Sequence, residues 1–301
     1  MKSRIELNQD KQHAIDQEQK KEKQKKRVKI ILKIMLIIFI FIFLLCLYVT
    51  KIGTTSLLVN ETMISASNLP SSFHGLKVIQ FSDVHYENKV LLEQTVASIN
   101  KRNPDLVFFT GDLLKDDNLS SSDRQDLTEQ LKKITTTIGK YAVLGETDNE
   151  EAISILIDCG FTILNNNYEL IYKNSNQPIL LIGLNTNDTI NYEQAFAYYQ
   201  QPEHNEDIYS IVLFHQPDTI DEILEHHAVD LALAGHSHGG EVNLFGLTSL
   251  AKKEGASKYD QAFYTIENTQ FYISSGLGTS DYPYRFCARP SINFFRFMRT
   301  A

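Results

Sequence analysis

The chain of 301 residues is 43% hydrophobic and 22% charged, which is enough for one large globular domain or two modest ones. Residues 1–51 hold twelve Lys or Arg against five Asp or Glu, whereas the rest hold 17 against 32, so a basic N-terminal segment precedes an acidic body. Proteins that bind nucleic-acid backbones need a basic face, so this distribution argues against nucleic acid as a partner.

The N-terminal segment has the pattern of a membrane anchor. Residues 1–28 are rich in Lys, Gln and Glu and are expected to form a basic cytoplasmic tail. Seventeen uncharged residues follow at 34–50, and a helix of that length spans roughly 26 Å, near the lower limit for crossing a membrane. Lys29 and Lys33 can extend this helix by reaching the lipid headgroups, so 29–50 is predicted to be a transmembrane anchor. A cleaved signal peptide is the alternative, but no small-residue cleavage site follows the run.

The charges around this run predict its orientation. Basic residues precede it in numbers, and only Lys51 stands close behind it. The positive-inside rule then places the N-terminus in the cytoplasm and the body outside, as in a single-pass protein of the cell membrane. We expect residues 51–72 to be a linker and residues 73–301 to form the folded domain.

Strand and helix signals alternate through most of this domain. Short apolar runs rich in β-formers predict strands at 76–83, 105–112, 141–148, 178–185, 209–215 and 230–236. Helical spacing or a glycine stop predicts helices at 90–102, 124–139 and 150–160. After Gly240 the signals are mostly strands, at 241–246, 263–268, 270–276 and 292–298. The alternation predicts parallel βαβ units, and the strand-rich end predicts additional strands at the sheet edges.

Five of the predicted strands end in residues that can bind a metal ion. In chain order these are Asp83 and His85, Asp112, Glu146 and Asp148, His215, and His236 and His238. A single Asp at such a position commonly caps a turn or a helix, but five equivalent strand ends favour one shared site. Carboxylates mixed with imidazoles suit Mn, Fe or Zn. The sequence therefore predicts a metal centre beyond the carboxyl ends of the strands.

The order Asp-x-His, Gly-Asp, Gly-x-x-Asp, a lone His and Gly-His-x-His resembles the calcineurin-like metallophosphoesterases over about residues 73–290. The segments "GLGTS" at 276–280 and "RFCARP" at 285–290 resemble the membrane-anchored bacterial branch of that family. This resemblance implies a four-layer α/β/β/α sandwich. It also implies that a hydroxide bridging two divalent metal ions (Mn, Fe or Zn) hydrolyses a phosphodiester or phosphomonoester. The catalytic domain would act outside the cell, on phosphoesters of lipids or cell-wall polymers.

The resemblance also implies roles for individual residues. It assigns Asp83, His85 and His238 to one metal, Glu146, His215 and His236 to the other, and Asp112 to a bridge between both. Asp112, Asp148 and His236 are expected to take part in catalysis. By the resemblance, Arg285 and Arg289 would contact the phosphate or a neighbouring acid. They could equally be ordinary surface arginines, and the sequence favours neither interpretation.

One motif departs from the family pattern. The family usually has Gly-Asn-His-Asp or Gly-Asn-His-Glu where this chain has Gly145-Glu146-Thr147-Asp148. Glu146 brings an additional negative charge to the second metal, and Thr147 cannot donate a proton as an imidazolium can. An alternative function is therefore a catalytically weakened relative that binds a phosphorylated envelope ligand or a partner protein. A purely structural metal site is disfavoured, because such sites prefer Cys and His.

Overall fold

The computed structural model describes residues 4–115, 119–185, 189–201, 207–243, 253–280 and 283–300. The chain divides into two compact units, Met1–Tyr48 and Val49–Ala301. The first unit is a helix, and the second contains every strand among the described residues.

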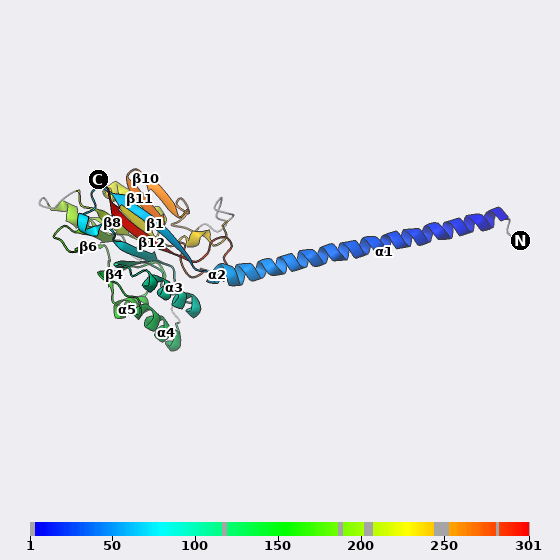
Figure 1. Ribbon diagram of the computed structural model, residues 1–301, viewed down its shortest axis with the longest axis horizontal. Helices are drawn as coiled ribbons and strands as arrows, with labels where there is room; N and C mark the ends of the chain where they lie inside the picture. Colours follow the sequence, from blue (N-terminus) through cyan, green and yellow to red (C-terminus); the bar gives the residue numbers. More distant parts are fainter. Residues whose placement is uncertain are drawn as a thin grey trace. The chain divides into compact units, whose positions relative to one another are not determined.

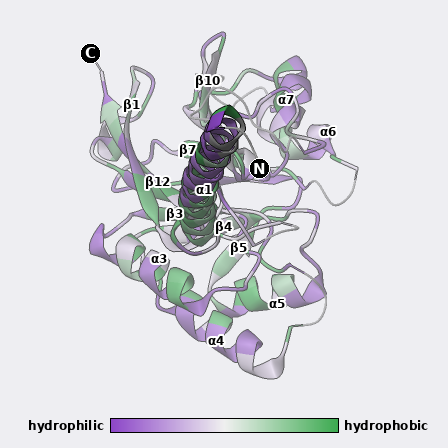
Figure 2. Ribbon diagram, turned by 90° about the vertical axis from the view of Figure 1, so that its right-hand side faces the viewer, coloured by the Kyte–Doolittle hydropathy of each residue, from purple (hydrophilic) through white to green (hydrophobic). Residues whose placement is uncertain are grey.

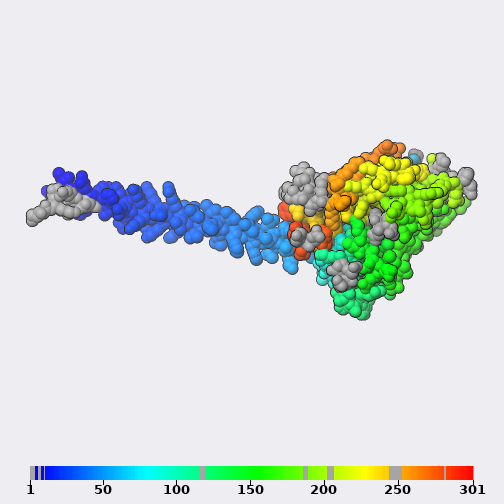
Figure 3. Space-filling view, turned by 180° about the vertical axis from the view of Figure 1, so that it is seen from behind, coloured from blue at the N-terminus to red at the C-terminus, as the bar shows by residue number. Residues whose placement is uncertain are grey.

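The first unit consists of one long helix, α1 (Arg4–Leu47). Its C-terminal half carries large exposed apolar side chains, among them Ile34, Leu36, Phe39, Phe41 and Phe43. Figure 3 shows the helix extending as a rod in the space-filling view. By length and composition this helix could cross a membrane, as the sequence predicted. Soluble proteins rarely expose a continuous apolar surface of this length to water, so this composition is typical of a helix that lies in lipid.

The second unit contains two six-stranded sheets (Figure 1). The strands of the first sheet lie in the order β1 (Leu58–Ala66), β12 (Ser291–Arg299), β2 (Lys77–Phe81), β3 (Leu106–Thr110), β4 (Gly139–Val143) and β5 (Phe161–Ile163). Only the β12–β2 pair is antiparallel. Helices α3 (Lys89–Lys101), α4 (Ser121–Lys132) and α5 (Glu150–Asp158) cover the outer face of this sheet (Figure 1).

The second sheet has a parallel centre and antiparallel edges. Its order is β10 (Phe263–Ile266), β11 (Thr269–Ile273), β9 (Leu231–Ala234), β8 (Ser210–Leu213), β7 (Ile179–Gly183) and β6 (Asn167–Ile171). The β10–β11 and β6–β7 pairs are antiparallel, and the pairs between them are parallel. The short helices α6 (Tyr192–Ala195) and α7 (Ile220–His226) lie on its outer side.

Three apolar layers hold the second unit together. Val78 and Phe108 lie in the layer between the two sheets, whereas their neighbours Ile79 and Phe109 lie in the layer beneath the helices of the first sheet. The third layer joins the second sheet to its own helices. Successive residues of a strand face opposite sides, so a sheet that is covered on both faces needs continuous apolar strands. The predicted four-layer α/β/β/α sandwich is confirmed.

Local signals set where the helices on the first sheet begin. Asn88, Ser120 and Asn149 precede α3, α4 and α5, and the side chain of each accepts a hydrogen bond from a backbone N–H of the first turn. Figure 2 shows both hydrophilic and hydrophobic residues along these helices, as expected when one face packs on a sheet and the other meets water.

The segment expected to be a linker differs from the prediction. Within residues 51–72, β1 forms a nine-residue strand that pairs in parallel with β12. Of its residues only Ile64 is fully buried, because β1 lies at the sheet edge, so its sequence lacks the apolar run that marks the central strands. The strand expected at 241–246 also differs: Val242 forms only an isolated bridge with Phe286, and residues 244–246 lie outside the described residues.

Candidate metal centre

The loops that follow β2, β3, β4, β8 and β9 bring the predicted metal ligands into two adjacent groups. Potential ligand atoms lie within 4.8 Å of one another inside each group. The first group contains Asp83, His85 and His238, and the second contains Asp112, Glu146, His215 and His236. All seven positions predicted from the sequence are therefore brought together, and their roles as ligands remain predictions.

The first group is almost fully buried. His238 Nε2 lies 3.2 Å from His85 Nε2 and 3.3 Å from Asp83 Oδ1. None of the three residues is more than 3% exposed. Burial and the neighbouring His238 lower the pKa of His85 to about 4, so its imidazole stays neutral, which is the form that binds metals.

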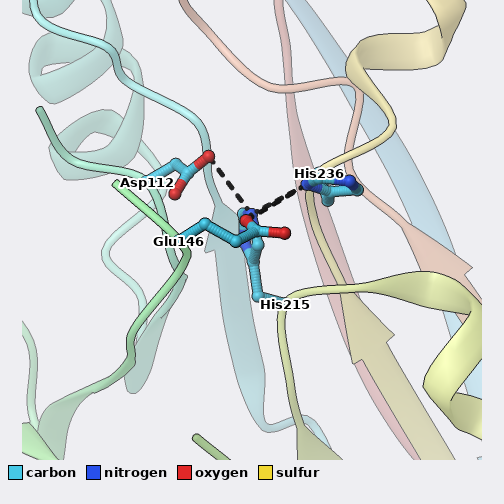
Figure 4. Close-up of side chains that lie close together, drawn as sticks. All are labelled: Asp112, Glu146, His215 and His236. Atoms are coloured by element: carbon cyan, nitrogen blue, oxygen red, sulfur yellow. Dashed lines mark hydrogen bonds and ion pairs between the residues drawn. The ribbon is translucent and has the colours of Figure 1, made fainter. Parts of the chain in front are cut away.

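The second group is more open (Figure 4). His215 Nε2 lies 2.9 Å from Glu146 Oε2 and 3.3 Å from His236 Nδ1. Glu146 is the most accessible member, with a side chain 35% exposed, and Gln216 donates a hydrogen bond to its other oxygen. Burial alone would raise the pKa of the Glu146 carboxyl, but hydrogen bonds from His215 and His236 outweigh it and hold that pKa far below its usual range. Glu146 is therefore an ionised carboxylate that faces the second ligand group.

Asp112 lies between the two groups. Its Oδ2 is 3.4 Å from His85 Nε2 and 3.2 Å from His215 Nε2, as a bridging carboxylate requires. Its Oδ1 accepts a hydrogen bond from the Thr147 backbone N–H at 3.0 Å. The Thr147 hydroxyl lies 2.9 Å from Asp112 Oδ1 and 2.6 Å from the Leu114 carbonyl oxygen, and its single proton serves one of them at a time. Thr147 thus restrains Asp112, a contact that the sequence did not indicate.

Five of the candidate ligands have left-handed backbone conformations. Their φ angles are 47° for Asp83, 35° for His85, 62° for Asp112, 66° for His236 and 49° for His238. Each such residue costs of order 1–3 kcal/mol, and the strain lets short loops turn their side chains inward.

The glycines of the motifs provide space for this turn. A Cβ at Gly145 would clash with Asp112 Oδ1, and one at Gly235 would lie 2.7 Å from the Thr110 carbonyl oxygen.

Three histidines are oriented by contacts behind the site. The Nδ1 of His215 lies 2.7 Å from the Thr110 carbonyl oxygen, and His236 Nε2 lies 2.7 Å from that of Glu254. The Nδ1 of His238 lies 3.3 Å from the Glu241 carboxylate. Such contacts fix the tautomer and the ring orientation of metal-binding histidines. Glu241 was not predicted from the sequence. It follows His238 by three residues, which was the one indication of this contact, and no motif marks the position.

Asp148 lies behind the metal ligands. Its two carboxylate oxygens accept hydrogen bonds from the backbone N–H groups of Asp112, Leu113 and Gly145 at 2.7–2.9 Å. Burial and the charge of Asp112 raise its pKa to about 6. Its oxygens thus join the two ligand loops. The catalytic role that the sequence predicted for Asp148 stays a prediction.

The two arginines considered for phosphate binding have other contacts. Arg285 is fully buried, and its guanidinium donates hydrogen bonds to the carbonyl oxygens of Gly278, Ser275 and Ala288. Arg289 donates to the carbonyl oxygen of Ser56 at 2.9 Å. Arg285 also donates a hydrogen bond to the His238 carbonyl oxygen at 3.2 Å, so this buried side chain ties together the loops that follow β9 and β11.

An open cavity of about 680 Å³ lies over the metal-ligand groups. His85, Asp112, Glu146 and His236 contribute to its wall, and so do Lys115 and Lys253. Lys253 brings positive charge to this cavity, whereas Lys115 forms an ion pair with Glu87 and Glu254 also lines the wall. A lysine that faces the candidate ligands supports binding of an anionic substrate. No motif marks either lysine in the sequence, because both lie in loops.

The donor set fits two metal ions. Imidazole nitrogens and carboxylate oxygens converge on two adjacent points that share Asp112, and such mixed ligands suit divalent Mn, Fe or Zn. Buried carboxylates this close together also require positive charge to balance them. The contacts behind His215 and His238 are those that orient metal-binding imidazoles.

Comparison with known proteins agrees with this geometry. Residues 76–240 match the family model described as calcineurin-like phosphoesterase. The chain is 29% identical over 250 residues to the uncharacterized metallophosphoesterase YkuE of Bacillus subtilis, covering 80% of this chain and 85% of that protein. It is 27% identical to a transmembrane protein with metallophosphoesterase domain of Danio rerio, covering 82% of this chain and 61% of that protein.

A third relative has a more specific description. The chain is 25% identical over 295 residues to the UDP-2,3-diacylglucosamine pyrophosphatase LpxG of Chlamydia trachomatis, covering 76% of this chain and 86% of that protein. The matched family segment contains all seven candidate ligands and more than half of the chain. The chain therefore belongs to the calcineurin-like phosphoesterase family and is a metal-dependent phosphoester hydrolase.

Proposed function

We propose that this protein is anchored in the cytoplasmic membrane by α1 and hydrolyses a phosphodiester, phosphomonoester or diphosphate outside that membrane. The observation that carries the catalytic part is Asp112, whose Oδ2 lies within 3.4 Å of a histidine from each ligand group. A shared carboxylate holds two metal ions close enough to act on the same phosphoryl group. The basic residues before α1 and the acidic body after it support the orientation.

Candidate metal ligands line the open cavity, so we expect the phosphoester to be hydrolysed there. Two divalent ions bound there would activate water and neutralise charge on the phosphoryl oxygens. The residues of the chain position that reaction: Asp112 and Glu146 would hold the ions, and Lys253 in the cavity wall would attract the anionic substrate. The attacking water oxygen forms a bond to phosphorus while the bond from phosphorus to the leaving oxygen breaks. Because Thr147 is engaged with Asp112, water or a cavity lysine would supply the leaving-group proton.

Elemental analysis combined with turnover tests this function. Purified full-length protein, reconstituted separately with Mn, Fe or Zn, should bind two ions per chain and hydrolyse bis(4-nitrophenyl) phosphate or 4-nitrophenyl phosphate. Two bound ions without turnover of either compound would instead support the alternative of a binding protein with weakened catalysis.

Protease treatment of intact cells tests the location. Digestion of residues 76–290 with protection of the N-terminal tail is expected. Protection of the body of the chain would overturn the proposed orientation.

A further inference from the structure

Glu146 brings a third carboxylate to the two ligand groups, in addition to Asp83 and Asp112. With Asp112 counted in both groups, each group then offers the same donors, two imidazoles and two carboxylates. Two divalent ions would bring four positive charges to these groups. Three carboxylates leave a net charge of one on the centre, whereas the other two carboxylates alone would leave a net charge of two.

The Glu146 carboxylate lies on the side of the centre that faces the open cavity. Its side chain is 35% exposed and lines the cavity, whereas Asp83 is fully buried. Its Oε2 lies 2.9 Å from His215 Nε2 and 3.3 Å from His236 Nδ1, and its other oxygen accepts the hydrogen bond from Gln216. An anion bound at the second ligand group would therefore meet the charge of Glu146 at close range.

The described wall of the cavity offers little positive charge to offset Glu146. Lys115 is paired with Glu87, and Glu254 lines the wall as does its neighbour in the chain, Lys253. No arginine contributes to this described lining, although arginine is the residue that can hold a phosphate by two parallel hydrogen bonds. Lys253 is thus the remaining cation of the described wall for a second negative charge on a substrate.

The two classes of phosphoester differ in charge. A phosphomonoester carries 1.5 to 2 negative charges at about pH 7, whereas a phosphodiester carries one, because a second ester group replaces an ionisable oxygen. Coulomb energy is proportional to the charge of the ligand, so a carboxylate beside the site repels a dianion about twice as strongly as a monoanion. The open cavity of about 680 Å³ has room for the second ester group.

We infer that Glu146 is a specificity-determining residue that shifts the preference of the centre from dianionic phosphomonoesters toward monoanionic phosphodiesters. This inference rests on the proposed function and makes phosphodiesters its favoured substrate class. The charge of Glu146 provides the discrimination, and the open cavity accepts the ester group that distinguishes a diester.

Two esters of 4-nitrophenol test the inference. Methyl 4-nitrophenyl phosphate is a monoanion, and 4-nitrophenyl phosphate is a dianion at pH 8. In both reactions the water oxygen bonds to phosphorus and 4-nitrophenol leaves, so the leaving group is constant. The two esters differ in intrinsic reactivity, so the readout is the diester-to-monoester ratio of kcat/KM in a variant relative to the wild-type full-length protein with metal bound.

Two variants neutralise the charge by different routes. Glu146→Gln removes the charge and keeps an oxygen that can bind a metal. Gln216→Lys places an ammonium group where the amide now contacts Glu146, and it leaves all seven candidate ligands in place. In both variants the ratio should fall about tenfold or more. A unit charge at roughly 5–10 Å, with an effective dielectric constant of about 20, changes the affinity for one further charge by at least that factor.

An exposed pair of the same residue types supplies the matched control. On α4, Gln125 donates a hydrogen bond to Glu129 at 2.8 Å, and neither residue lines the cavity. Glu129→Gln and Gln125→Lys should therefore leave the diester-to-monoester ratio unchanged.

A binding measurement tests the same charge effect without turnover. Methyl(phenyl)phosphinate is a monoanion, phenylphosphonate is a dianion at pH 8.5, and neither contains an ester bond. Titration calorimetry of the metal-loaded protein measures both affinities. Gln216→Lys should bind phenylphosphonate about tenfold more tightly relative to methyl(phenyl)phosphinate than the wild type does, because the dianion gains about twice the Coulomb energy.

The outcomes distinguish the two proposals. If the wild type holds two ions per chain and hydrolyses neither ester, the proposed function is overturned, and the inference with it. Hydrolysis of both esters with the wild-type ratio in Glu146→Gln and Gln216→Lys would overturn the inference alone. Elemental analysis accompanies each variant, and Gln216→Lys decides the test if Glu146→Gln loses a metal ion.

Discussion

The two halves of the metal centre are built differently. Asp83, His85 and His238 are buried within the fold, whereas Glu146 in the other half is 35% exposed at its side chain and opens onto the cavity. The closed half is backed by the buried carboxylate of Glu241, and the open half by the amide of Gln216 at the surface. The closed half is therefore fixed by the fold and reaches the cavity through His85, whereas the open half reaches it through Glu146 and His236.

This difference bears on the departure from the family motif that the sequence predicts at Glu146 and Thr147. A change of charge in the closed half would be costly, because a buried ion needs a partner within the protein. Glu146 lies in the open half, where water and Lys253 moderate its negative charge. The predicted departure therefore falls on the more accessible side of the centre.

Removing the carboxylate of Asp112, which lies between the two ligand groups, should have the largest effect on metal binding and activity. Asp112→Ala should lose the second metal and weaken the first, and lower kcat by about 10³-fold or more, because charge stabilisation by a metal is worth several kcal/mol. Elemental analysis and turnover of bis(4-nitrophenyl) phosphate measure both effects. Asp126→Ala, which removes a surface ion pair with Lys89, is the control. Retention of two metals in Asp112→Ala would show that the halves do not share this carboxylate.

Removing the partner of His238 in the closed half should weaken metal binding more than removing the partner of Glu146 in the open half. Glu241→Gln removes the carboxylate behind His238 and should weaken metal binding at the first group about 10–100-fold, as measured by titration against a chelator. Gln216→Ala removes an exposed hydrogen bond to Glu146 and should cost only a few-fold at the second group. Equal losses in the two variants would contradict the contrast between closed and open halves.

Lys253 should affect the substrate and not the metals. Lys253→Met keeps much of the side-chain length but removes the charge that faces the cavity, so kcat/KM for an anionic phosphodiester should fall about tenfold. Metal content should stay at two ions per chain. Lys173→Met, at an ion pair away from the centre, is the matched control. A loss of metal in Lys253→Met would mean that this lysine supports the ligands themselves.

The smallest effect is expected from the hydroxyl of Thr147. Thr147→Val keeps the shape and the backbone hydrogen bond to Asp112 but removes the hydroxyl, so kcat should fall about three- to tenfold. Thr147→Ser should restore most of the rate. If Thr147→Val is as active as the wild type, the backbone N–H alone holds Asp112.

Much of this architecture could be predicted because local patterns determine it. The central strands are continuous apolar runs that end in polar residues, so the parallel strands and the five ligand-bearing ends could be predicted from the residues, whereas the four-layer sandwich was implied by the family resemblance. Edge strands such as β1 lack that pattern, and their pairing depends on distant residues. Glu241 and Lys253 were missed because their positions depend on loop geometry. The burial of Arg285 was not predicted, because it depends on carbonyl groups from two loops, that of His238 after β9 and those of Ser275 and Gly278 after β11.

The pairing of β1 with β12 bears on how the chain reaches its destination. The side chains of Asn60 and Asn293 lie 3.1 Å apart although 233 positions separate them in the chain. β12 is also the only neighbour that joins β1 to the rest of the first sheet. A ribosome must therefore synthesise nearly the whole chain before this sheet can close, and such long-range pairing is slow. A translocation channel would thus receive β1 still unpaired, and the domain could thread across the membrane before it folds.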